Sequence, residues 1–185
     1  MLRKEMTKIE IEKELAGKGD YVLIDNITRF AKENIPTDIR KFIYTKLAEI
    51  YERRNMFGDA ADIYGKIAEI SAPAEKSRNF VKETQCYIKA GFFDRADMAL
   101  KKIISEVKAG ERATIMISIK EFYKNQAQIY EKEKRRNRAA KTYEKLLTLN
   151  ISDAEKSEIN KKLLALYKEL GMIGELMKMR NKLGI

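Results

Sequence analysis

The stretch 130–147, YEKEKRRNRAAKTYEKLL, concentrates the side chains best suited to binding an anion. It holds seven Lys and Arg residues against three Glu, with Arg135, Arg136, Arg138 and Lys141 at its centre. Guanidinium and ammonium groups pair with phosphates and carboxylates, so the cluster indicates either a nucleic-acid contact or a solvated helix face. Its tyrosines are expected in the core, which disfavours base stacking and sequence-specific recognition of single strands.

Residues typical of catalytic and metal sites are scarce. The chain has no histidine, which removes the commonest general base and metal ligand. The single cysteine, Cys86, can form neither a thiolate metal cluster nor an internal disulfide. Its place beside Tyr87 on the inner face of an expected helix favours a buried apolar role over a nucleophile. The segment AGKGD, residues 16–20, lacks the length and the terminal Ser or Thr of a phosphate-binding loop. We therefore expect no catalysis, no cofactor and no metal.

The composition favours long helices with polar faces. Charged residues make up 36% of the chain and hydrophobic ones 44%, with two Pro and nine Gly. A net charge of +10 would attract an acidic partner, whether nucleic acid, anionic lipid or a carboxylate-rich protein. No apolar run approaches the roughly 20 residues of a membrane span, and the first residues lack the apolar block of a signal peptide. A cytoplasmic location is expected.

An internal repeat places the basic stretch on a pair of helices. Residues 51–68, YERRNMFGDAADIYGKIA, align without gaps with the stretch that begins at Tyr130. Identical residues fall at 51 and 130, 52 and 131, 60 and 139, and 64 and 143. Within 51–66 there are three basic and three acidic residues, so the repeat does not require the excess charge of the later copy. Aromatic residues at helical spacing around alanines predict two antiparallel helices in close contact.

Extended in both directions, this pattern resembles the tetratricopeptide repeat. The first helix carries an aromatic residue, Leu, a small residue and Tyr, and the second carries Ala, an aromatic residue and an aliphatic one. The best copy supplies Tyr44, Leu47, Ala48, Tyr51, Ala60, Tyr64 and Ile67. Weaker copies run through residues 80–104, 159–183 and 9–31, and Glu83 stands where the family prefers Leu. The period exceeds the roughly 34 residues of the family, which is similar to the longer helical hairpins of soluble NSF attachment proteins.

The resemblance implies an all-α fold, a right-handed superhelical solenoid of about five hairpins in one domain, residues 1–185. The hairpins are expected at 1–35, 36–72, 73–110, 111–150 and 151–185. Pro36 and Pro73 fall between copies, where a helix restarts and a missing N–H costs little. Ser152 and Glu155 have the spacing of a capping box that opens the last hairpin. A longer first helix is expected from about Glu111.

The resemblance also implies a concave groove lined by the first helix of each hairpin. The groove positions of the family, carried over to this sequence, are Glu49, Arg53, Arg78, Lys82, Gln85, Lys89, Lys124, Gln128, Lys132, Lys161 and Lys168. Because the later positions are mainly Lys and Gln, an extended or helical peptide with acidic residues would fit this groove. The alternative for these residues is an ordinary exposed helix face.

The interpretation favoured by the sequence is a non-catalytic adaptor that binds an acidic protein segment in this groove. One alternative is an RNA- or ribosome-associated protein that uses the basic edge at residues 135–141. Another, which follows the resemblance to the attachment proteins, is a role in assembling membrane-linked complexes. The last hairpin carries Met172, Met177 and Met179, which either fill the core or, if Met177 is exposed, support self-association.

Overall fold

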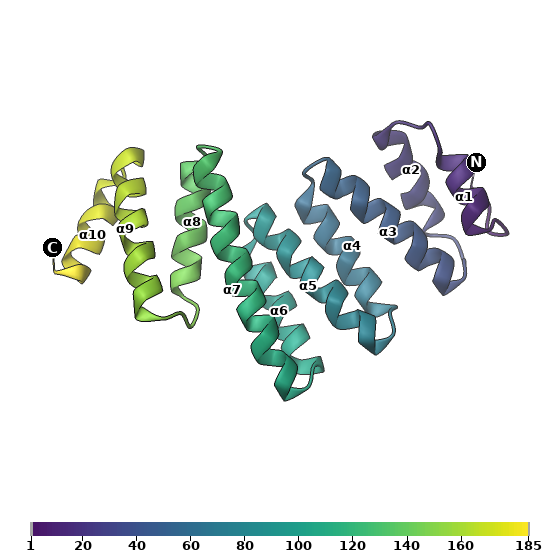
Figure 1. Ribbon diagram of the computed structural model, residues 1–185. Coiled ribbons are helices and arrows are strands. Elements are labelled where there is room, and N and C mark those ends of the chain that lie inside the picture. The colour runs from purple at the N-terminus through teal and green to yellow at the C-terminus, as the bar shows by residue number, and fades with distance from the viewer. Residues whose placement is uncertain (1, 185) are drawn as a thin grey trace. The chain divides into compact units, whose positions relative to one another are not determined.

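A computed structural model describes the backbone of residues 2–184 and every side chain in that range except that of Ala74. The described chain contains ten helices and no strand (Figure 1). In chain order the helices are α1 (Lys8–Leu15), α2 (Asp20–Phe30), α3 (Thr37–Arg53), α4 (Phe57–Glu69), α5 (Pro73–Ala90), α6 (Phe93–Glu106), α7 (Ala109–Lys132), α8 (Arg136–Leu147), α9 (Asp153–Leu170) and α10 (Ile173–Leu183). The all-α prediction is confirmed, and the superhelical arrangement stays a prediction.

The chain divides into two compact units, Met1–Lys108 and Ala109–Ile185. In the first unit, α2 packs on α3, and α3, α4 and α5 each pack on the next helix. In the second unit, α7 packs on α8, α8 on α9, and α9 on α10. Helices that follow one another within a unit run antiparallel (Figure 1).

Small residues allow the helices of a hairpin to approach closely. Ala48 of α3, Ala60 of α4 and Ala139 of α8 are all 0% exposed. Tyr64 and Tyr143, each four residues after one of these alanines, are only 3% and 1% exposed. The predicted seam of alanine and tyrosine therefore forms the core of both α3–α4 and α7–α8.

Several helices begin or end at capping, proline or glycine residues. The Ser152 and Glu155 side chains each accept a hydrogen bond from the backbone N–H of the other, so the predicted capping box is confirmed. Pro73 occupies the first turn of α5. Both α5 and α9 end at a glycine in the left-handed conformation, Gly91 with φ +81° and Gly171 with φ +69°. The long helix expected from about Glu111 is α7.

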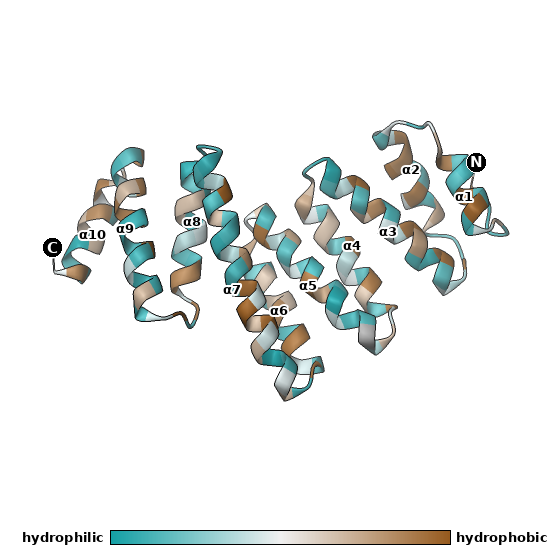
Figure 2. Cartoon of the chain, in the orientation of Figure 1, coloured by the Kyte–Doolittle hydropathy of each residue, from teal (hydrophilic) through white to brown (hydrophobic). Residues whose placement is uncertain are grey.

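The last helix is only loosely covered. None of the described residues of α10 is buried, and Ile173 and Met177 are 62% and 51% exposed. Polar and apolar residues are interspersed along it (Figure 2). The exposure of Met177 meets the condition set for self-association, which itself stays a prediction. Among the helices described, none has both the length and the apolar character that crossing a membrane requires.

Candidate functional site

In the first unit, Lys82 and Lys89, which were predicted to line a groove, already have partners. Tyr64 of α4 donates a hydrogen bond to Glu52 of α3 at 2.6 Å, and the Lys89 ammonium lies 3.4 Å from the same carboxylate. Lys89 also lies over the ring of Phe57, 5.0 Å from its centroid, and Lys82 lies at the same distance from the ring of Tyr64. This surface is therefore closed by contacts within the unit.

The other groove positions of the first unit do not form one basic surface. Arg53 is paired with Asp20 of α2. Arg78 and Glu49 are exposed, and Gln85 is half-buried. Arg53 and Glu49 border a different hollow, which is formed by α1, α2 and α3. The first unit thus offers an acidic segment few available charges.

The second unit repeats the polar network of the first. Tyr143 of α8 donates a hydrogen bond to Glu131 of α7 at 2.5 Å, and Lys162 of α9 lies 3.4 Å from that carboxylate. Lys162 also donates to the Tyr143 hydroxyl at 3.1 Å. Burial, followed by the Glu131 carboxylate, raises the pKa of Tyr143, so the phenol stays protonated as a donor.

An open hollow of about 530 Å³ adjoins this network. It is bounded by the end of α7, the turn into α8 and one face of α9. We call it the basic hollow, and its lining residues are Glu131, Lys132, Lys134, Arg136, Lys161, Lys162, Ala165, Leu166 and Glu169. Five of these residues are basic and two are acidic, so the hollow attracts anions.

Three lysines of the basic hollow remain available to a ligand. Arg136 is paired with Glu169, and Lys162 with Glu131. Lys132, Lys134 and Lys161 are exposed, and none of them has an ion pair within residues 2–184. Their charge is therefore balanced only by solvent in the free protein.

The position of Lys134 is unusual for a lysine. Its φ is 58°, in the left-handed region, and the equivalent residue of the first unit, Asn55, has the same φ. In both turns this conformation allows the next residue to close the helix end, as when Arg135 N–H donates to Tyr130 O at 2.8 Å. Asparagine tolerates left-handed backbone better than lysine does. The second unit thus has a charge where the first has the conformationally easier residue.

The arginine cluster predicted as a nucleic-acid edge is divided in the structure. The Arg135 guanidinium is 3.2 Å from the Glu133 carboxylate and 4.9 Å from the centroid of the Tyr130 ring. The Arg138 guanidinium lies 6.0 Å from the centroid of the same ring. Arg136 lines the basic hollow instead. Lys141 is exposed on α8.

Contacts between helices determine the partners of Glu131 and Arg135. These two residues lie one helical turn apart, a spacing at which ion pairs form on a helix. The Glu131 carboxylate is instead occupied by Tyr143 and Lys162, and Arg135 pairs with Glu133. Contacts from neighbouring helices have replaced the local one.

Only two of the predicted groove residues, Lys132 and Lys161, enter the basic hollow. Lys124 lines a narrow gap with Glu155 and Glu158, where α7 faces the start of α9. Gln128 is half-buried on α7 and Lys168 is exposed on α9. Sequence reasoning did not assign Lys134, Lys162 and Glu169 to a site. The alignment of Lys134 with Asn55 was the one available signal for the first of them.

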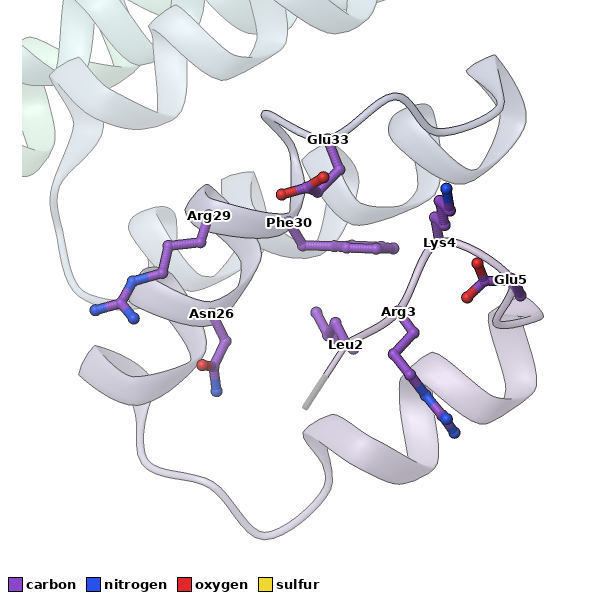
Figure 3. Close-up of a pocket in the computed structure, with 8 residues that line it drawn as sticks. All are labelled: Leu2, Arg3, Lys4, Glu5, Asn26, Arg29, Phe30 and Glu33. Carbon is purple, nitrogen blue, oxygen red and sulfur yellow. The ribbon is translucent and has the colours of Figure 1, made fainter.

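Other hollows, in the first unit, have a different chemistry. One of about 330 Å³ lies between the N-terminal segment and α2; its lining mixes Arg3, Lys4 and Arg29 with Glu5 and Glu33 (Figure 3). A second, of about 300 Å³, is formed by α1, α2 and α3; its lining includes apolar Leu15, Ile27 and Ile50, with Glu49 and Arg53 also lining it. Neither has the excess of lysine seen in the basic hollow.

The thiol of Cys86 is buried, as predicted. The residue is 3% exposed, and burial raises the pKa of its thiol to about 12. The unreactive protonated form therefore dominates at neutral pH. In the described part of the chain no three His, Cys, Asp or Glu side chains are placed to hold a metal ion.

The chain matches no protein-family model and no curated protein. The resemblance to the tetratricopeptide repeat therefore stays a prediction.

Proposed function

We propose that this protein is a non-catalytic binding module that holds an acidic protein segment in the basic hollow of its second unit. The observation that carries this proposal is the convergence of Lys132, Lys134 and Lys161 from α7, the following turn and α9, all without an ion pair in the described structure. Carboxylates of a single segment would reach all three lysines within this one opening.

The form of the site favours an extended acidic segment of a protein. Ala165 and Leu166 add apolar surface to the lining, which suits the carbon atoms of a peptide. Aromatic faces on which bases would stack are absent from its lining residues. Lys134 supports the proposal further, because a lysine kept in a left-handed turn indicates a use for its charge.

A titration of the full chain with a fluorescein-labelled peptide of eight glutamates tests this function by fluorescence anisotropy. Reversing the three charges, as K132E/K134E/K161E, should weaken binding by at least about tenfold, since three attractive contacts become repulsive. K66E/K101E/K108E is the control, because it changes the net charge equally at exposed lysines of the first unit. A peptide of eight glutamines should not bind.

Two results would overturn the proposal. In one, the control variant loses as much affinity as the variant of the hollow, which would mean that net charge alone attracts the peptide. In the other, single-stranded oligouridylate binds more tightly than the glutamate peptide at the same salt concentration. That result would favour the nucleic-acid alternative and should be accompanied by a steep dependence of affinity on salt.

A further inference from the structure

The two carboxylates of the basic hollow differ in how firmly they are held. Glu131 accepts a hydrogen bond from buried Tyr143 and lies beside Lys162, and its side chain is 30% exposed. Glu169 has Arg136 as its ion-pair partner within the described residues, and the two side chains are 53% and 43% exposed. Exposed pairs of this kind contribute little to stability because water competes for both charges. Glu169 is therefore the carboxylate that can leave at small cost.

The location of Glu169 also disfavours a carboxylate. It lies one residue before the end of α9, where the last carbonyl groups give the helix a partial negative charge. The first unit has a cation, Lys89, at the equivalent place near the end of α5. With its carboxylate in the hollow, Glu169 offsets one of the five cations that an acidic ligand would use.

We propose that Glu169 is an internal acidic occupant of the basic hollow, held by Arg136 in the free protein and displaced when an acidic segment binds. This inference rests on the proposed function. The segment first meets the three unpaired lysines, and one of its carboxylates then replaces that of Glu169 on the Arg136 guanidinium. Glu131 stays in place because Tyr143 and Lys162 hold it. Glu169 thereby lowers the affinity for weakly acidic segments, which cannot complete the exchange.

The substitution E169Q, measured with the same eight-glutamate peptide, tests this inference. It removes the internal competitor and leaves Arg136 available, so affinity should rise by up to about fivefold, the upper limit for an exposed ion pair. E175Q is the matched control, because it makes the same charge change at an exposed residue of α10 outside the hollow. The gain from E169Q should clearly exceed the gain from E175Q.

Carbon-detected NMR of the wild-type chain gives a second measurement that does not depend on affinity. On addition of the peptide, the chemical shift of the Glu169 side-chain carboxyl carbon should change. The change for Glu131 should be no larger than the changes for glutamates far from the basic hollow. Equal gains from E169Q and E175Q, or an unmoved Glu169 signal at saturation, would overturn the inference. If the wild-type chain binds and K132E/K134E/K161E weakens binding as expected, the proposed function survives that failure. If the wild-type chain does not bind, the proposed function itself has failed.

Discussion

The region α3–α5 of the first unit and the region α7–α9 of the second share a core of alanine and tyrosine and differ at their surfaces. Both bury an alanine and a tyrosine at the helix crossing, and both direct the tyrosine hydroxyl to a glutamate of the preceding helix. In the first region Lys89 then closes the surface over Glu52 and Phe57. In the second, Glu169 occupies the place equivalent to Lys89, and Arg136 the place equivalent to Phe57.

This difference shows which residues each part of the hairpin requires. Packing restricts the buried alanines and tyrosines to these residue types, because a change of side-chain volume in a close-packed core lowers stability. The charged residues around the tyrosine hydroxyl are partly exposed, so they are less restricted by packing than the core is. The second region uses that freedom to leave three lysines unpaired, and the first does not.

The largest expected effect tests whether the two interiors are equivalent. Replacing either buried tyrosine by alanine, as Y64A or Y143A, should lower the free energy of unfolding by about 3–5 kcal/mol, because each leaves a large cavity. Urea unfolding followed by circular dichroism measures both. A cost below about 1 kcal/mol for one of them would show that its tyrosine does not anchor the seam.

A buried carboxylate distinguishes the two interiors at one position. Glu83 of α5 and Leu163 of α9 each stand four residues before a buried tyrosine, and they are 6% and 0% exposed. A Cβ on Gly65 would lie 3.0 Å from Oε1 of Glu83, so the glycine makes room for the carboxylate. Oε2 of Glu83 has no hydrogen-bond partner in the part of the chain that the structure describes.

Burial raises the pKa of Glu83 from 4.5 to about 7, although Lys102 and Arg95 of α6 oppose the shift and Asp62 and Glu69 of α4 add to it. The folded state therefore binds this proton more tightly than the unfolded chain does. The free energy of unfolding should fall as pH rises from about 4.5 to about 7, by about 2–3 kcal/mol in all.

The substitution E83Q should remove this pH dependence and raise stability at pH 8 by a similar amount, since the charge no longer has to be buried. Urea unfolding at pH 5 and pH 8 measures the effect, and E121Q, at an exposed glutamate of α7, is the control. The prediction fails if the E83Q chain and the wild-type chain lose equal stability between the two pH values.

A smaller effect separates the hydroxyl from the ring. Y64F and Y143F keep the packing but remove the donor to Glu52 and Glu131, and each should cost about 1–2 kcal/mol. Y143F should cost less if Lys162, which lies 3.4 Å from Glu131, compensates. Urea unfolding of both variants gives the comparison. A stabilising effect of either would mean that the hydroxyl is not a useful donor.

The smallest effect concerns the two left-handed turns. K134G should stabilise the chain by about 0.5–1 kcal/mol, because glycine adopts φ 58° without strain, whereas N55G should change stability by only a few tenths. K134G should at the same time weaken binding of the glutamate peptide. Thermal unfolding and the anisotropy titration measure the two effects. Loss of stability in K134G would contradict the strain at this turn.

Much of the fold was predictable from the sequence because it depends on local periodicity. The spacing of Ala60 and Tyr64, and of Ala139 and Tyr143, identified the buried faces of two helices, α4 and α8. The capping box at Ser152 and the start of the long helix near Glu111 were also predicted from the sequence, because nearby residues determine where a helix begins and ends. The burial of Glu83 was not expected, because nothing local shows that Gly65 of α4 provides space for it.

By itself, therefore, the sequence determined the helices, their buried faces and the excess of positive charge. Tertiary structure alone decided which charges are free. Long Lys, Arg and Glu side chains form ion pairs between helices. Glu131 pairs with Lys162 of α9 and not with Arg135, and Glu169 pairs with Arg136 of α8. Such choices depend on distances between residues remote in sequence, which a periodic pattern does not contain. The basic hollow, made by three segments that meet only in the folded second unit, is the result.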